Sequence, residues 1–145
     1  MVSWSPVLDR GDGVWLGVID GDGLGVGSRE SVSKRIAVGN YVPLWPLLEG
    51  GLDETLASVT MNWGDLSSSG IGSPESLLQL VVRSAIDGDR PYWIGLSMRW
   101  LSGMAAIEAF DRSFVEDSLR TVIASRQASQ SIRHEAQGVL RSMGA

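Results

Sequence analysis

The first forty residues alternate apolar and polar side chains in short runs, which is typical of strands with one buried face. Gly-Asp-Gly clusters separate these runs and supply turns between them. Strands are therefore expected at residues 2–8, 14–19, 24–27 and 34–39, joined as an antiparallel meander. The period of two predicts one buried set of side chains: Trp4, Val7, Val14, Leu16, Val18 and Leu24.

Two prolines interrupt the segment that follows these strands. Pro43 and Pro46 allow only a short helix, which is expected to start near Leu44. Gly50 and Gly51 then end that helix, because glycine readily adopts the left-handed conformation found after helix C-termini.

The next stretch fits two structures. Residues 57–63 alternate apolar and polar side chains, which favours a strand. A helix from Asp53 to about Met61 competes with it, because this aspartate would cap the helix and the following glutamate would suit its first turn. Residues 64–73 are rich in glycine and serine and predict a loop.

From residue 74 onward, apolar side chains recur every three or four positions, which is the period of helices with one buried face. The first helix is expected to be capped by Ser73 and to end at residues 87–89, and the second to run from about Pro91 to Phe110. Their predicted buried side chains are Leu77, Leu78, Val81, Val82 and Ala85 in the first, and Trp93, Leu96, Trp100, Leu101, Met104 and Ile107 in the second.

Two further helices are expected toward the C-terminus. Ser113 and Glu116 have the spacing of a capping box, which predicts the start of a third helix. A fourth helix over about 129–143 stops at Gly144. The expected buried side chains are Val115, Leu119, Val122 and Ile123 in the third, and Ile132, Ala136, Val139, Leu140 and Met143 in the fourth.

These elements predict an α+β fold, with an N-terminal antiparallel β-meander packed against a C-terminal array of three to four helices. At 145 residues the chain has the length of one domain. Residues 1–145 are accordingly expected to form a single domain, in which a glycine and serine seam at 64–73 separates a β-rich half, 1–63, from a helical half, 74–145.

The predicted C-terminal helical hairpin carries a recognisable packing pattern. Ile132, Arg133, Ala136 and Leu140 stand in the order Ile-Arg-x-x-Ala-x-x-x-Leu. The hairpin over 112–143 thereby resembles a single HEAT-type repeat. That resemblance implies a protein-binding surface rather than a catalytic one.

Charge is distributed unevenly along the chain. The net charge is −5, and residues 1–73 carry nine acidic and four basic side chains, whereas residues 74–145 carry eight of each. Nucleic-acid binding depends on neutralising phosphates, so an acidic face argues against nucleic acid and favours a basic protein partner.

Composition limits which chemistry the protein can perform and which cellular compartment is expected. The chain has no cysteine, which excludes disulfides and thiolate chemistry. No apolar run approaches the ~20 residues that a membrane span requires. A soluble, cytoplasmic protein without membrane contact is expected, and eleven arginines against one lysine favour a bacterial source.

The stretch RGDGVWLGVIDGDGLGVG, residues 10–27, concentrates aspartates in glycine-bracketed turns. A calcium loop starting at Asp20 would need oxygen ligands at its fifth and twelfth positions, which Leu24 and Ser31 occupy. The dinucleotide fingerprint fails because Val26 stands in place of its third glycine. We therefore expect neither a metal ion nor a cofactor.

The leading functional hypothesis is a non-enzymatic, acidic protein-binding module whose turn aspartates meet a basic partner. In a small bacterial protein, this charge favours an inhibitor of the immunity or antitoxin type. The expected binding residues are Asp12, Trp15, Asp20 and Asp22, with Trp15 exposed beside the turns as an aromatic anchor.

Two other functions stay open. A small carboxylate-dependent hydrolase would use Asp9, Asp12, Asp20 and Asp22 as acid and base, provided that they converge at one end of the meander. A structural subunit would use exposed apolar surface for homo-oligomerisation. His134 is the only histidine and is expected on the exposed side of its helix, which disfavours a histidine-based metal site or triad.

Overall fold

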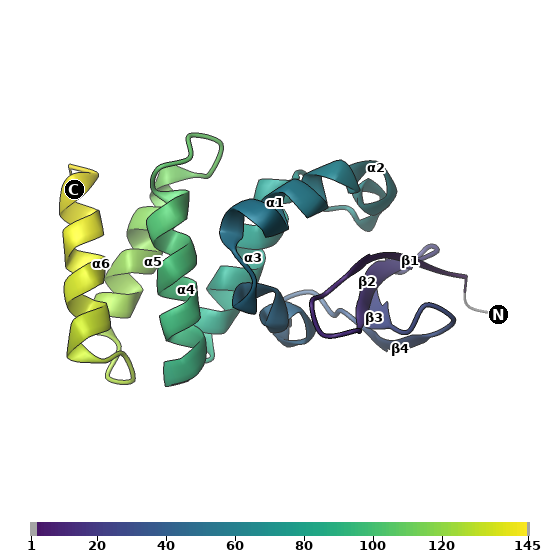
Figure 1. Ribbon diagram of the computed structural model, residues 1–145, viewed down its shortest axis with the longest axis horizontal. Helices are drawn as coiled ribbons and strands as arrows, with labels where there is room; N and C mark the ends of the chain where they lie inside the picture. Colours follow the sequence, from purple (N-terminus) through teal and green to yellow (C-terminus); the bar gives the residue numbers. More distant parts are fainter. Residues whose placement is uncertain (1–2, 145) are drawn as a thin grey trace. The chain divides into compact units, whose positions relative to one another are not determined.

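The computed structural model describes residues 3–144 and begins with an antiparallel sheet. Its strands are β1 (Trp4–Asp9), β2 (Trp15–Ile19), β3 (Gly23–Gly27) and β4 (Val32–Arg35), and each pairs with the next along the chain (Figure 1). Helices follow the sheet, so the predicted α+β class and the N-terminal meander are confirmed.

A bulge in β1 sets which side chains face the core. The pairing shifts between Pro6 and Leu8, which places Leu8 opposite Leu16 of β2. An extra residue in one strand of a pair re-aims the side chains after it. The buried side chains on this face of the sheet are Leu8, Leu16, Val18, Leu24 and Val26.

The predicted buried face is therefore wrong for three of its members. Trp4 pairs with Ile19 and lies on the opposite face from Leu16, while Val7 falls at the bulge and Val14 precedes β2; all three are half-buried. A strict period of two cannot follow a register that a bulge shifts by one residue.

On the opposite face of the sheet, the ring of Trp4 packs directly against Gly17. A Cβ atom on Gly17 would lie 2.8 Å from Cη2 of Trp4 and 2.2 Å from the carbonyl oxygen of Ser5. The indole Nε1 of Trp4 donates a 2.9 Å hydrogen bond to the carbonyl of Ser28, just beyond β3. Glycine at position 17 thus lets the aromatic ring cross the sheet.

Short helical segments follow the sheet. The 3₁₀ helix η1 (Val42–Glu49) contains Pro46 and ends at Gly50, as the prolines and glycines predict. It is followed by α1 (Leu52–Met61), so the strand favoured for residues 57–63 is wrong and the competing helix is right. The alternation was misleading because Met61, one of its apolar positions, is 84% exposed.

The glycine and serine segment is partly helical. It contains α2 (Trp63–Leu66) and η2 (Ser67–Ser69), which ends at Gly70 with a positive φ of 88°. In the N-terminal part of the chain, α2 contacts β2 and η2 contacts β3. Helical turns therefore cover the sheet where a loop was expected.

The helices from residue 74 onward follow their predicted order. The first, α3 (Pro74–Asp87), is capped by Ser73, whose hydroxyl accepts a 3.1 Å hydrogen bond from the amide of Ser76. The next, α4 (Pro91–Met104), ends six residues before the predicted Phe110. The predicted burial of Trp100, Leu101 and Met104 is confirmed, whereas Trp93, Leu96 and Ile107 are only half-buried, the last of them beyond the end of α4. The other buried side chains of α4 are Ile94, Ser97 and Met98.

The last two helices are α5 (Arg112–Ala124) and α6 (Gln130–Ser142), and α4, α5 and α6 contact one another (Figure 1). The predicted capping box is wrong, because the cap of α5 is Asp111, whose Oδ1 accepts a 3.0 Å bond from the amide of Ser113. An aspartate one residue before the helix satisfies the free amides of the first turn.

The chain divides into two compact units, residues 1–81 and 82–145, and the division falls inside α3 rather than in segment 64–73. We call them the N-terminal and C-terminal units. The expectation of a single domain stays a prediction.

Candidate functional site

Asp9 and the three aspartates of the glycine-rich stretch 10–27 lie in two loops of the N-terminal unit. Asp9 and Asp12 belong to the β1–β2 connection, and Asp20 and Asp22 to the β2–β3 turn. Successive turns of a meander lie at opposite ends of the shared strand, here the five residues of β2, which span about 16 Å at the usual rise per residue. The structure therefore does not bring the four carboxylates together.

The β1–β2 loop is held by its own acidic side chains. Oδ1 of Asp9 accepts hydrogen bonds from the amides of Gly11 and Gly13, at 2.7 and 3.2 Å. The guanidinium of Arg10 donates two bonds to the carboxylate of Asp12, at 3.0 and 2.5 Å. Both carboxylates thus stabilise the loop itself.

Arg10 also joins this loop to η1. Its Nη1 donates a 2.6 Å hydrogen bond to the carbonyl of Pro43, and its side chain is only 14% exposed. The hydrogen bond from Arg10 lowers the pKa of Asp12 below its ordinary value of 3.8, and the amide of Val14 acts in the same direction. A pair of this kind keeps Asp12 ionised and leaves it poorly suited to donate a proton.

The β2–β3 turn presents two exposed aspartates with different surroundings. Asp22 forms an ion pair with Arg35 of β4, at 3.4 Å between Oδ1 and Nε. Asp20 lines a depression of about 360 Å³ together with Asp65 of α2 and the serines at positions 3, 5 and 68. The lining of this depression is mainly polar, and Asp20 itself is exposed.

Trp15 lies on the face of the sheet opposite Leu16, as expected from the strand alternation. Its ring is half-buried rather than exposed, and the guanidinium of Arg29 lies over it, 5.0 Å from the ring centre. This cation–π contact already occupies one face of the predicted aromatic anchor.

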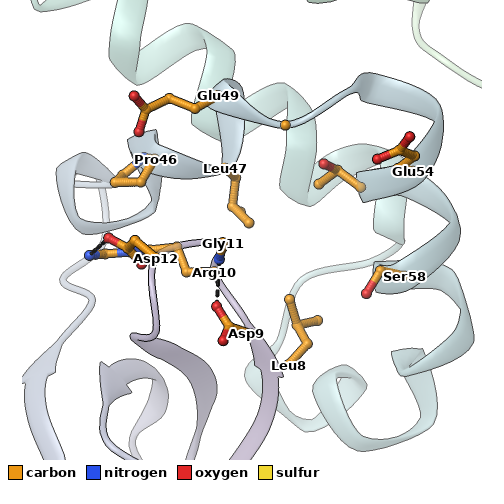
Figure 2. A pocket seen from close by; sticks show the side chains of 12 residues that line it. Leu8, Asp9, Arg10, Gly11, Asp12, Pro46, Leu47, Glu49, Glu54 and Ser58 are labelled. Atoms are coloured by element: carbon orange, nitrogen blue, oxygen red, sulfur yellow. Dashed lines mark hydrogen bonds and ion pairs between the residues drawn. The ribbon is translucent and has the colours of Figure 1, made fainter.

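A pocket of the N-terminal unit lies between the β1–β2 loop, η1 and α1. We call it the acidic pocket; its volume is about 260 Å³. Figure 2 shows Leu8 and Leu47 pointing toward each other across its floor, with Glu54 on the α1 side, opposite the loop that carries Asp9. The lining residues are Leu8, Asp9, Arg10, Gly11, Asp12, Pro46, Leu47, Glu49, Gly50, Glu54, Thr55 and Ser58.

Sequence reasoning found two of the acidic residues of this pocket and missed the other two. Asp9 and Asp12 were expected from their turn, but Glu49 and Glu54 stand some forty residues away along the chain. The one sequence signal that could have indicated Glu49 and Glu54 was the excess of acidic side chains in residues 1–73. Their convergence requires that η1 and α1 fold back onto the β1–β2 loop.

The four acidic residues belong to the pocket lining but do not form a tight cluster. Within residues 3–144, no three side chains among His, Cys, Asp and Glu lie close enough together to hold a metal ion. His134 is exposed on α6, as expected. In the described part of the chain, no helix is both long and apolar enough to cross a membrane.

In the part of the chain that the structure describes, the large exposed apolar side chains are Val38 and Val42 before and within η1, Met61 at the end of α1 and Tyr92 in α4. Isolated exposed apolar residues are ordinary on protein surfaces. Homo-oligomerisation therefore stays a prediction.

Comparison of the chain with family models, with curated proteins and with solved structures gave no match.

Proposed function

We propose that the N-terminal unit is a non-enzymatic module that binds a basic protein segment at the acidic pocket. The observation that carries this proposal is the composition of the pocket wall. Its described lining contains four carboxylates and one guanidinium, a formal charge of −3, around an apolar floor. That guanidinium, on Arg10, is already bound by Asp12 and Pro43.

The pocket suits a long basic side chain better than a small cation. Lysine and arginine combine an apolar stem with a charged head. A stem lying on Leu8 and Leu47 would bring its head toward Glu54 on the wall of α1. Because the pocket is small, the partner would present one protruding side chain, with neighbouring basic residues meeting the acidic surface around it.

The proposal gives the binding residues predicted from the sequence different roles. Asp12 acts by pairing with Arg10, the one basic residue of the pocket lining, and so offsets its positive charge. Trp15, Asp20 and Asp22 lie away from the pocket lining and remain predictions of a separate contact. An immunity or antitoxin type of inhibitor, acting in the cytoplasm, is the more specific version of the proposal and rests on size and charge alone.

A hydrolase based on the four aspartates is not part of the proposal. Asp9 and Asp12 are engaged by the loop, and Asp20 and Asp22 lie at the other end of β2. An acid and a base must reach the same scissile bond, which two ends of one strand do not allow.

The test measures binding of a fluorescent arginine-rich peptide by anisotropy, with a lysine-rich and an acidic peptide for comparison. The variant Glu49→Gln/Glu54→Gln removes two pocket charges. We expect it to bind the arginine-rich peptide roughly three- to tenfold more weakly, as for two partly exposed ion contacts. Wild-type binding should also weaken with added salt.

The matched control is Glu108→Gln/Glu135→Gln, which removes the same charge from exposed positions of the C-terminal unit. We expect this variant to bind the peptide nearly as well as the wild type. Equal binding by the two double variants would show that net charge alone attracts the peptide, and the pocket proposal would then be wrong.

A further inference from the structure

The chain contains four Asp-Gly dipeptides, and they differ in the hydrogen bonds and ion pairs that restrain them. They are Asp12-Gly13, Asp20-Gly21, Asp22-Gly23 and Asp87-Gly88. An aspartate followed by glycine can cyclise, because the unhindered glycine amide reaches the side-chain carboxyl carbon. Whether it does so in a folded protein depends on whether both groups are free to meet.

Two of the four dipeptides are held by hydrogen bonds. At Asp12-Gly13 the glycine amide donates to Asp9, and the carboxylate is bound by Arg10. The same pairing lowers the pKa of Asp12, which disfavours the neutral acid needed for cyclisation. At Asp87-Gly88 the glycine amide donates a 3.0 Å bond to the carbonyl of Ser84, at the end of α3.

A third dipeptide is partly restrained. Asp22 forms its ion pair with Arg35, and Gly23 is the first residue of β3, where it pairs with Ile19. Cyclisation at this position would require the ladder to open at its end. It should therefore be slower than at a position whose peptide group lies outside the sheet.

Asp20-Gly21 carries neither restraint. Asp20 is exposed, and within residues 3–144 its carboxylate has no hydrogen-bond or ion-pair partner, nor does the amide of Gly21 have an acceptor. The peptide between them is the central peptide of a turn closed by a 2.9 Å bond from the amide of Asp22 to the carbonyl of Ile19. Gly21 has a φ of 74°, the left-handed value that a type II turn has at its third position. A central turn peptide can rotate without breaking the bond that closes the turn.

We infer that Asp20-Gly21 is a site of spontaneous isoaspartate formation in the folded protein. The amide nitrogen of Gly21 bonds to Cγ of Asp20 in its neutral acid form, the amide proton is lost, and one carboxyl oxygen leaves as water. The resulting succinimide then takes up one water. Cleavage of the original peptide bond to nitrogen gives isoaspartate, whereas cleavage of the new bond restores aspartate.

The product changes the turn without changing the mass or requiring any other reactant. The side-chain methylene of Asp20 enters the main chain, which lengthens the β2–β3 turn by one atom, and the original backbone carboxyl becomes the side chain. The modified position borders the depression that Asp20 and Asp65 share and lies at the opposite end of β2 from the acidic pocket. The inference is therefore independent of the proposed function.

The test follows isoaspartate at each dipeptide over time in the full chain at physiological temperature and pH. A parallel sample is unfolded in guanidinium chloride. Cleavage after Arg10 and Arg29 leaves three of the dipeptides in one peptide, so fragmentation that distinguishes the two linkages must assign them. We expect Asp20-Gly21 to react roughly tenfold or more faster than Asp12-Gly13 in the folded chain, because a hydrogen bond to a charged group must otherwise break first.

In the unfolded sample we expect the four dipeptides to react at similar rates. Asp20→Glu should abolish the product at position 20 alone, since the larger ring forms far less readily, while the matched Asp22→Glu should leave it unchanged. The inference is overturned if, in the folded chain, another of the four dipeptides reacts as fast as Asp20-Gly21. It is also overturned if position 20 accumulates no isoaspartate while the unfolded chain does.

Discussion

The two units of the protein are stabilised in opposite ways. In the N-terminal unit, close packing depends on an absent side chain, because Gly17 lets Trp4 and the β1 main chain lie against β2. In the C-terminal unit, packing depends on side chains that are present, such as Leu101, Leu119 and Ala136, each with no exposed surface. Replacing a glycine by alanine should therefore have opposite effects on the free energy of unfolding in the two units.

The largest effect is expected for Gly17→Ala. The added methyl group would lie 2.2 Å from the carbonyl oxygen of Ser5 and 2.9 Å from Cα of Pro6, both of which are main-chain atoms. Main-chain atoms of a paired strand cannot move aside without breaking the ladder. We expect a loss of about 2–4 kcal/mol in the free energy of unfolding, measured by urea denaturation followed by circular dichroism.

Gly138→Ala is the matched control in α6. Among the described residues, nothing lies within 4 Å of the position that its Cβ would occupy, so helix propensity alone should decide. We expect a gain of up to about 1 kcal/mol. Similar losses in the two variants would contradict the contrast between the units.

An intermediate effect is expected at two buried serines of the C-terminal unit. Ser97 in α4 and Ser118 in α5 are 0% and 3% exposed, and their hydroxyls have no hydrogen-bond partner within the described range. Burial of an unsatisfied hydroxyl is costly. We expect Ser97→Ala and Ser118→Ala each to raise the free energy of unfolding by about 1 kcal/mol, including the gain in helix propensity.

Ser129→Ala provides the comparison for these variants. Ser129 caps α6, and its hydroxyl accepts a 3.1 Å bond from the amide of Ile132. Its removal should cost about 1 kcal/mol, as for other serine caps. If all three substitutions lower stability to the same extent, the buried hydroxyls are satisfied in solution and the prediction is wrong.

The contrast between the units also explains which elements the sequence could predict. The helices of residues 74–144 were found because their apolar side chains recur with the helical period and Ser73 caps α3. The sheet was found as a meander from its turns. The prediction of its buried face was partly wrong. The bulge that redirects Leu8 depends on pairing with β2 and cannot be read from local hydropathy.

The candidate site was less predictable for the same reason. Asp9 and Asp12 were visible in their turn, but their partners across the pocket, Glu49 and Glu54, belong to η1 and to the first turn of α1. The alternation at 57–63 favoured a strand, which obscured the helix that carries Glu54. Local patterns record the chemistry of a loop, whereas a pocket between three segments depends on contacts distant in sequence.

The smallest effect concerns the pair that fixes the β1–β2 loop. The pKa of Asp12 lies below its ordinary value of 3.8, and the main cause is the hydrogen bond from Arg10. A carboxylate with a lowered pKa in the folded state contributes stability above its unfolded-state pKa, and that stability is lost as the pH falls through the folded-state pKa. Because the side chain of Asp12 is 42% exposed, solvent screening should keep this contribution well below about 1 kcal/mol.

Asp12→Asn isolates this contribution. The difference in unfolding free energy between the wild type and the variant should be constant at neutral pH and should shrink as the pH falls below 3.8. Arg10→Gln supplies the control, because without the guanidinium the Asp12→Asn substitution should lose most of its pH-dependent effect. A pH-dependent difference that persists in the Arg10→Gln background would mean that the amide of Val14, rather than Arg10, holds Asp12 ionised.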